Sequence, residues 1–298
     1  MRIASTSSPA IVTLLSVALA MLISGVAMAQ PTTPMASPAT LDADSPIYLA
    51  LGDSLAYGKG ASDRASTAYV PLLHESLKQG PGCPDGASVP CNNLQLVNLA
   101  EDGATSQELL DNQVPAATEI IAARNGDDDP ANDVTVITID IGGNDVYKPL
   151  RDVCATGLGP ECLQAIETTF TTFGENLTVA LGQLRQAGGP DTTIAVMTYF
   201  NSLIACDRKD TAAAGNLVLE GAPDGTPGLN DLIRQVAGEV DAVVVEMFGQ
   251  IDAGDLIGGT DCLHPNDTGY AKIAAAFVAA IVGPTATPIA LADDTRQR

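Results

Sequence analysis

Two residues of this sequence have the types and surroundings of a nucleophile and its base. Ser54 stands in the segment GDSL (52–55), directly after the apolar segment 47–51. A serine hydroxyl is a weak nucleophile unless a base takes its proton, and histidine suits that task near neutral pH. His264 lies in DCLHP (261–265), three residues after Asp261, whose carboxylate could accept a hydrogen bond from the imidazole ring. The pattern predicts a relay of Ser54, His264 and Asp261.

Two other segments could donate hydrogen bonds to the oxyanion that forms when a serine attacks a carbonyl carbon. Gly103 follows the apolar segment 94–99, and its N–H is not screened by a side chain. Asn144 follows two glycines after the β-branched segment 134–141, and its side-chain amide is a donor. Gly103 and Asn144 are therefore candidates for an oxyanion hole.

Each of these segments also has an ordinary structural explanation. Ser54 could cap a helix, Gly103 and Asn144 could belong to turns, and His264 could be a structural residue before a helix. The chain has only two histidines, and the other, His74, has no acid three residues before it and is expected on a helix surface. The combination and order of the segments, rather than any one of them, favour a catalytic site.

Strand and helix signals alternate along the chain. Segments rich in β-branched and apolar residues predict strands over 47–51, 94–99, 134–141, 193–200 and 242–248. Apolar residues at helical spacing predict helices over 106–124 (with a kink or break at Pro115), 162–187, 229–240 and 268–282. This alternation predicts an α/β fold in which helices cover both faces of a parallel sheet.

The predicted sheet also explains why the candidate residues could meet. Open α/β sheets bind ligands outside the carboxyl ends of their strands. Ser54, Gly103 and Asn144 each follow a predicted strand, and Asp261 and His264 come just before the last predicted helix. We therefore expect all five at one edge of the sheet.

With these four blocks in this order, the chain resembles the SGNH/GDSL hydrolase family, whose blocks carry Ser, Gly, Asn and His. The matching residues are Ser54 in GDSL, Gly103, Asn144 in GGND, and Asp261 with His264 in the D-x-x-H-P segment. The likeness spans roughly residues 47–283. The opening GDSLAYG, the block GGNDV and the six cysteines are most similar to the secreted bacterial lipase/esterase branch.

The resemblance implies a single flavodoxin-like domain, a three-layer α/β/α sandwich with a five-stranded parallel sheet. It implies that Ser54 is the nucleophile, His264 its base and Asp261 the residue that orients the base. The Ser54 N–H, the Gly103 N–H and the Asn144 amide would bind the oxyanion. The expected activity is hydrolysis of carboxylic esters, such as lipid esters, through an acyl-enzyme, without a metal or an organic cofactor.

Two alternatives remain open at this point. The first is a carbohydrate O-acetylesterase of the same fold, which the absence of tryptophan slightly disfavours because sugar platforms are often built on stacked indole rings. The second is a non-catalytic binding domain that kept the fold. One departure from related chains also stands out: Glu101 and Asp102 precede Gly103. Two carboxylates that point inward would disfavour anionic substrates, and the sequence does not fix their orientation.

The N-terminus has the pattern of a secretory signal peptide. Arg2 is followed by an apolar stretch over 11–23, and Ala27-Met28-Ala29 fits the small-x-small rule for cleavage near Ala29. The apolar stretch is short for a membrane anchor. We expect a signal peptide (1–29), a flexible linker (30–45), the hydrolase domain (46–284) and a flexible tail (285–298). The expected location is outside the cytoplasm, either extracellular or periplasmic.

Six cysteines in an exported chain favour disulfides. Cys83 and Cys91 flank one loop rich in glycine and proline, and Cys154 and Cys162 flank another, which leaves Cys206 and Cys262 as a third candidate pair. Sequence alone does not fix the connectivity. Since Cys262 lies between Asp261 and His264, a bridge to Cys206 would tether the catalytic loop, and we hypothesise that it holds the catalytic geometry.

The charge and composition exclude several other classes of function. The net charge is −22, which disfavours binding to nucleic acid and to anionic membranes. The absence of C-x-x-C motifs and the presence of only two histidines argue against a zinc site. The expected partner is a small-molecule or lipid ester, with no stable membrane anchor. The oligomeric state is not fixed by the sequence, and a monomer is favoured.

Overall fold

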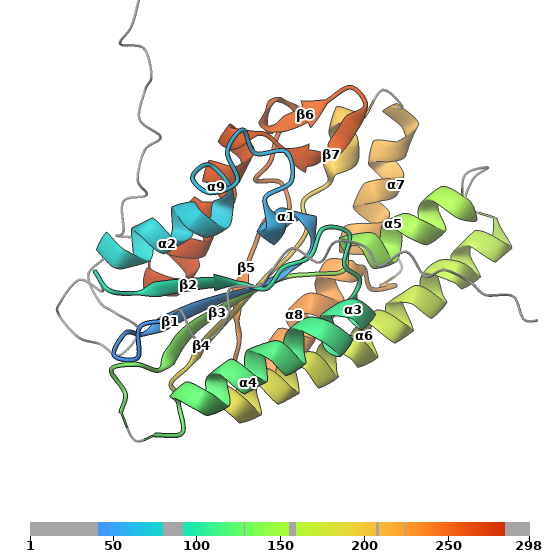
Figure 1. The fold of residues 1–298 in the computed structure, drawn as a ribbon. Coiled ribbons are helices and arrows are strands. Elements are labelled where there is room, and N and C mark those ends of the chain that lie inside the picture. Colours follow the sequence, from blue (N-terminus) through green and yellow to red (C-terminus); the bar gives the residue numbers. More distant parts are fainter. Residues whose placement is uncertain are drawn as a thin grey trace, which may run out of the picture. The chain divides into compact units, whose positions relative to one another are not determined.

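The centre of the fold is a five-stranded parallel sheet with the strand order β2-β1-β3-β4-β5 (Figure 1). A computed structural model describes residues 41–79, 92–127, 129–154, 159–206, 209–223 and 225–283. The strands are β1 (Ile47–Gly52), β2 (Gln95–Asn98), β3 (Val134–Asp140), β4 (Thr193–Met197) and β5 (Val243–Val245). This order is that of flavodoxin-like sheets. Every residue of β1 and β3 is buried, because helices cover both faces of the sheet.

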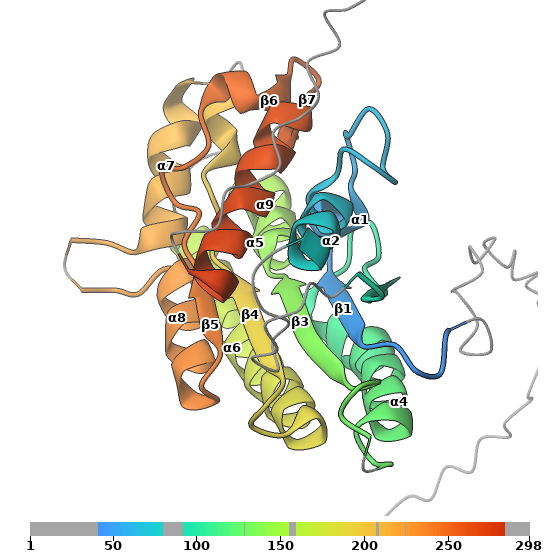
Figure 2. The ribbon, with the colours of Figure 1, turned by 90° about the vertical axis from the view of Figure 1, so that its left-hand side faces the viewer.

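The helices form one layer on each face of the sheet. On one face α1 (Ser54–Tyr57), α2 (Tyr69–Gln79) and α9 (Asp267–Val282) lie together, and Figure 2 shows α9 beside α2. On the other face α4 (Val114–Arg124), α6 (Pro160–Gly188) and α8 (Leu229–Glu239) pack against one another. The result is the expected three-layer α/β/α sandwich in a single domain.

The remaining elements cluster near the carboxyl ends of the strands. They are α3 (Ser106–Glu108), the π-helical turn η2 (Leu109–Gln113), α5 (Gly143–Asp152), the 3₁₀ turns η3 (Ser202–Ala205) and η4 (Ala253–Asp255), α7 (Lys209–Glu220), and the strands β6 (Leu256–Gly258) and β7 (Asp261–Pro265). Strands β6 and β7 form a separate antiparallel pair. These short elements place polar side chains at one edge of the main sheet.

Local sequence explains where the helices begin. Thr105 and Glu108 form a capping box at the start of α3, in which each side chain bonds the backbone N–H of the other residue. Asn266 caps α9 through its side-chain oxygen, which accepts hydrogen bonds from the N–H groups of Thr268 and Gly269. Helix α6 begins at Pro160, whose missing N–H costs nothing at the first helical position.

The structure corrects several predicted elements. The predicted helix 106–124 consists of α3, η2 and α4 without a gap, and the irregularity expected at Pro115 is the π-helical turn just before it, with Pro115 in the first turn of α4. The segment Asp261–Pro265, for which no element was predicted, is a strand that pairs with β6. The predicted fourth strand ends at Met197, three residues early. Helices α5 and α7 were not predicted.

The predicted signal peptide (1–29), most of the linker (30–45) and the tail (285–298) lie outside the described residues, as do Cys83 and Cys91. In the part of the chain that the structure describes, no helix is both long and apolar enough to cross a membrane.

Candidate active site

The three residues of the predicted relay form a continuous chain of hydrogen bonds. Ser54 is the first residue of α1, directly after β1, and its Oγ lies 3.0 Å from Nε2 of His264. The Nδ1 atom of His264 lies 2.8 and 2.9 Å from the two carboxylate oxygens of Asp261. With the proton on Nδ1, the ring donates to Asp261 and its Nε2 accepts from the serine hydroxyl. This is the geometry that a serine nucleophile requires.

Asp261, the acid of this series of hydrogen bonds, is held as a carboxylate. Burial alone would raise the pKa of Asp261, but the hydrogen bond from His264 lowers it below its ordinary value. The backbone N–H groups of Leu263 and His264 also donate to its Oδ1 atom, at 3.3 and 3.2 Å. Asp261 can therefore hold the imidazole in one tautomer and stabilise the imidazolium that forms when the ring accepts a proton.

The two predicted oxyanion donors lie beside this chain. Gly103 has a φ of +85°, a left-handed conformation that favours glycine, and a Cβ at this position would meet no atom within 4 Å. Asn144 lies in the first turn of α5, and one N–H of its side chain donates to the Ala104 carbonyl at 2.9 Å. Since a side-chain amide carries two N–H donors, the second remains for a ligand.

A second contact ties the same two loops together. The carboxylate of Asp145 accepts hydrogen bonds from the N–H and the hydroxyl of Ser106, at 2.9 and 2.5 Å. The Asn176 amide of α6 donates to the Ser106 hydroxyl at 3.1 Å. Asp145 thus connects the start of α5, which carries Asn144, to the start of α3, which follows Gly103.

A cavity of about 270 Å³ lies at this site. Ser54, His264, Gly103 and Asn144 line it. Apolar side chains from α5, the segment after β4, η3, α7 and α8 also line it. They include Val146, Leu150, Phe200, Leu203, Val218 and Leu229. The cavity can therefore receive a molecule with a polar reacting group and an apolar chain.

Three buried side chains fix the turn between β1 and Ser54, and sequence reasoning did not identify them. Gln113 forms two hydrogen bonds of 2.8 Å with Gly52, accepting from its N–H and donating to its carbonyl. Asp140 accepts from the Ala56 N–H at 3.0 Å, and a Cβ on Gly52 would lie 1.9 Å from its Oδ1 atom. Tyr199 donates through its hydroxyl to Asp53 at 2.5 Å.

Two of the acids around this turn are completely buried. Burial raises the pKa of Asp53 to about 6, although hydrogen bonds from the Leu55 N–H and the Tyr199 hydroxyl act in the opposite direction. Burial and the charge of Asp53 raise the pKa of Asp140 well above its ordinary value. At neutral pH we therefore expect one negative charge on this pair, with the proton on Asp140.

The structure also shows where the two acids before Gly103 point. Asp102 forms an ion pair with Lys59, whose Nζ lies 3.0 and 3.1 Å from the two carboxylate oxygens, and both residues line the cavity. Glu101 is exposed and is not part of the cavity wall. The charge of Asp102 is thus balanced at the rim of the site by a lysine from the loop after α1.

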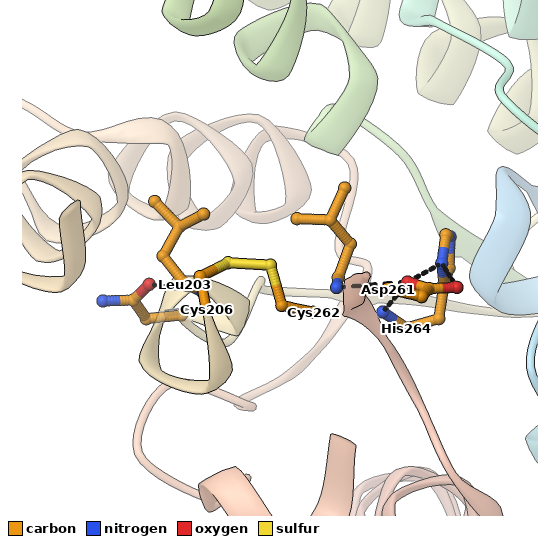
Figure 3. The surroundings of a disulfide bond; sticks show 7 residues. Leu203, Cys206, Asp261, Cys262 and His264 are labelled. Carbon is orange, nitrogen blue, oxygen red and sulfur yellow. Dashed lines mark hydrogen bonds and ion pairs between the residues drawn. A yellow bond between two sulfur atoms is a disulfide. The ribbon is translucent and has the colours of Figure 1, made fainter. Parts of the chain in front are cut away.

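A disulfide lies directly beside the relay (Figure 3). It joins Cys206, at the end of η3, to Cys262, which stands between Asp261 and His264 in β7. A second disulfide joins Cys154 to Cys162, between α5 and α6. The first bridge connects the strand that carries the acid and the base to the segment that follows β4.

The second histidine, His74, does not line the cavity. It is in α2, and its Nε2 lies 2.7 Å from the Leu94 carbonyl. Burial lowers the pKa of His74. The residue lies on a helix, as expected, but it is half-buried because the segment before β2 contacts its ring. Within the described ranges, no group of three or more His, Cys, Asp and Glu side chains could hold a metal ion.

Comparisons with known proteins identify the family and the fold. A family model described as GDSL-like Lipase/Acylhydrolase matches residues 48–277. No curated protein matches the chain in sequence.

Several solved structures share the fold. A lipase from a goat rumen metagenome has a TM-score of 0.58 and 17% identity, covering 79% of this chain and 97% of its own. The extracellular lipase of Streptomyces rimosus has a TM-score of 0.57 and 19% identity, covering 79% and 100%. An acetylxylan esterase from Geobacillus stearothermophilus has a TM-score of 0.50 and 17% identity, covering 80% and 96%.

Proposed function

Because this chain belongs to the GDSL-like lipase/acylhydrolase family and is a carboxylic ester hydrolase, we propose that Ser54, His264 and Asp261 are its catalytic triad. The observation that carries the proposal is the unbroken hydrogen-bonded chain from the Ser54 hydroxyl through the His264 ring to the Asp261 carboxylate. Ser54 and His264 line a cavity that is large enough for part of an ester substrate.

The proposed reaction has two steps. The Ser54 hydroxyl attacks the carbonyl carbon of the ester while His264 takes its proton, and the carbonyl oxygen becomes an oxyanion held by the Ser54 N–H, the Gly103 N–H and the second N–H of the Asn144 side chain. His264 then gives its proton to the leaving alcohol, which leaves an acyl group on Ser54. In the second step His264 activates a water molecule, and hydrolysis releases the acid and the free enzyme.

The cavity supports an ester with an apolar acyl group as the substrate. Much of the cavity wall consists of aliphatic and aromatic side chains such as Leu150, Phe200 and Val218. Such a wall gains free energy from burying methylene groups, whereas a sugar would leave its hydroxyl groups there without partners. We therefore favour a lipid or simple acyl ester over a carbohydrate acetyl ester.

Labelling and a substrate panel test the proposal together. A fluorophosphonate probe should label the wild-type protein and fail to label Ser54→Ala. Replacement of His264 by Gln should abolish ester hydrolysis. The matched control, His74→Gln, should hydrolyse esters at the wild-type rate. The rates of hydrolysis of esters with acyl chains from acetyl to palmitoyl, and of an acetylated polysaccharide, then define the substrate. An unlabelled wild-type protein, or fast deacetylation of the polysaccharide alone, would contradict the proposal.

We also propose that the enzyme is secreted as a monomer after removal of residues 1–29, with a linker over 30–45, a catalytic domain over 46–284 and a tail over 285–298. The disulfides Cys154–Cys162 and Cys206–Cys262 support export, since such bonds form in oxidising compartments. Sequencing the N-terminus of protein recovered outside the cytoplasm tests this. A mature chain that still begins at Met1 would contradict it.

A further inference from the structure

The hydroxyl of Tyr199 connects the two halves of the proposed catalytic machinery. Tyr199 follows β4, lines the cavity and is 7% exposed. Its hydroxyl donates to Oδ2 of Asp53 at 2.5 Å. The same hydroxyl lies beside Gly143, where an added Cβ would be 3.4 Å from the hydroxyl oxygen. The phenol is therefore in contact with two different segments of the chain, through a hydrogen bond to Asp53 and through packing on Gly143.

Each of these partners is the immediate neighbour of a proposed reacting residue. Asp53 precedes Ser54 and is the N-cap of α1, where its Oδ1 atom accepts from the Leu55 N–H at 2.9 Å. Gly143 precedes Asn144 at the start of α5. A shift of the Tyr199 hydroxyl would therefore move the nucleophile turn and the oxyanion helix relative to each other.

The rest of Tyr199 is held so that its hydroxyl cannot easily shift. Its backbone N–H donates to the side-chain oxygen of Asn230 at 2.7 Å, and its carbonyl accepts from the side-chain nitrogen of Asn230 at 2.9 Å. Asn230 is completely buried in α8. The ring packs on Gly143, where an added Cβ would lie 2.8 Å from Cε1 of the ring. Glycine at 143 is thus the residue that lets the ring approach this closely.

We propose that Tyr199 is a positioning residue that sets the placement of the Ser54 nucleophile relative to the Asn144 donor, which rests on the roles proposed above for Ser54 and Asn144. The phenol does not touch the reacting atoms. It acts through Asp53 on one side and Gly143 on the other, so its loss should affect the transition state more than the binding of the ground-state ester.

The test compares two variants that each lose one buried phenolic hydroxyl. Tyr199→Phe keeps the ring and its packing on Gly143 but removes the hydrogen bond to Asp53. Tyr48→Phe is the matched control, because Tyr48 is completely buried in β1 and its hydroxyl bonds the Thr138 hydroxyl at 2.8 Å. Fluorophosphonate titration counts the folded, reactive sites in each preparation, so kcat is expressed per titrated site. Inhibition by phenylboronic acid reports the binding of a tetrahedral, transition-state-like adduct.

In Tyr199→Phe we expect kcat per titrated site to fall about 10- to 100-fold while KM changes by no more than about twofold. The affinity for phenylboronic acid should fall in parallel with kcat. In Tyr48→Phe both constants should stay within about twofold of the wild type, although the protein unfolds at a lower urea concentration.

Three results would overturn the inference. They are an unchanged kcat per site in Tyr199→Phe, an equal loss in Tyr48→Phe, and a rise in KM alone, which would make Tyr199 only a wall of the substrate pocket. A wild-type protein that neither reacts with the fluorophosphonate nor hydrolyses esters would instead refute the proposed function, before any variant is compared.

Discussion

Removal of the disulfide between Cys206 and Cys262 should cost more stability than removal of the one between Cys154 and Cys162. In the chain-entropy description, a bridge stabilises by restricting the unfolded chain, and the effect grows with the length of the closed loop. The sequence separations are 56 and 8 residues. They correspond to losses of about 4 and about 2.5 kcal/mol in the free energy of unfolding at 25 °C.

The same comparison separates a stabilising role from a catalytic one. Cys262 lies between Asp261 and His264, so loss of the disulfide frees the strand that carries these two residues. We expect Cys206→Ala/Cys262→Ala to lower kcat per titrated site about tenfold. Cys154→Ala/Cys162→Ala, in which the lost bridge lies between α5 and α6, should keep kcat and lose only stability.

Urea unfolding of the wild type and the two double-alanine variants measures the first difference, and ester hydrolysis with fluorophosphonate titration measures the second. The entropic argument fails if loss of the shorter bridge costs as much as loss of the longer one. The catalytic argument fails if kcat per site is unchanged in Cys206→Ala/Cys262→Ala, or in the wild type after reduction of this disulfide has been confirmed.

Three other changes have defined outcomes. Asn144→Ala should lower kcat about 10²- to 10³-fold with little change in KM, as steady-state hydrolysis will show. Lys59→Gln should lower kcat about threefold, because it leaves the Asp102 charge unbalanced beside Gly103, and adding Asp102→Asn should restore it, as a double-mutant cycle measures. Because burial raises the pKa of Asp53 from 3.8 to about 6, its contribution to stability is complete below pH 3.8 and is lost as the pH rises through 6. Urea unfolding between about pH 4 and 7 should show a steeper decline in the wild type than in Asp53→Asn, in which the raised pKa of Asp140 still lowers stability as the pH rises.

The fold class could be predicted because its signals are local. Five segments rich in β-branched and apolar residues alternate with helical patterns, and the parallel sheet with helices on both faces follows from that alternation. The polar residues after the strands could then be assigned to one edge of the sheet, because the carboxyl ends of parallel strands share that edge. Helix α5 was missed because it begins with Gly143 and contains Pro149, both of which normally argue against a helix.

The supporting residues could not be predicted, since their roles depend on distant contacts. Tyr199 looked like part of a strand, because aromatic residues favour strands, yet the chain leaves the sheet at Met197 and turns this ring toward Asp53. Gln113 lies in a π-helical turn that no periodicity reveals, 61 residues from the glycine it bonds. Asp140 looked like an ordinary strand residue, and its pKa is raised only because the fold buries it beside Asp53.

The distance along the chain between Ser54 and His264 has a consequence for the synthesis of the protein. The two residues are 210 positions apart, and α9, which follows His264, reaches back to the N-terminal part of the domain. There the Phe277 ring stacks on Tyr69 at 5.1 Å, and the Tyr270 hydroxyl donates to the Lys59 carbonyl at 2.6 Å. A ribosome therefore makes the proposed nucleophile, Ser54, 210 residues before its proposed base, His264. By the proposed mechanism, a nascent chain cannot hydrolyse esters until His264 and α9 have left the ribosome and packed on the N-terminal part of the domain.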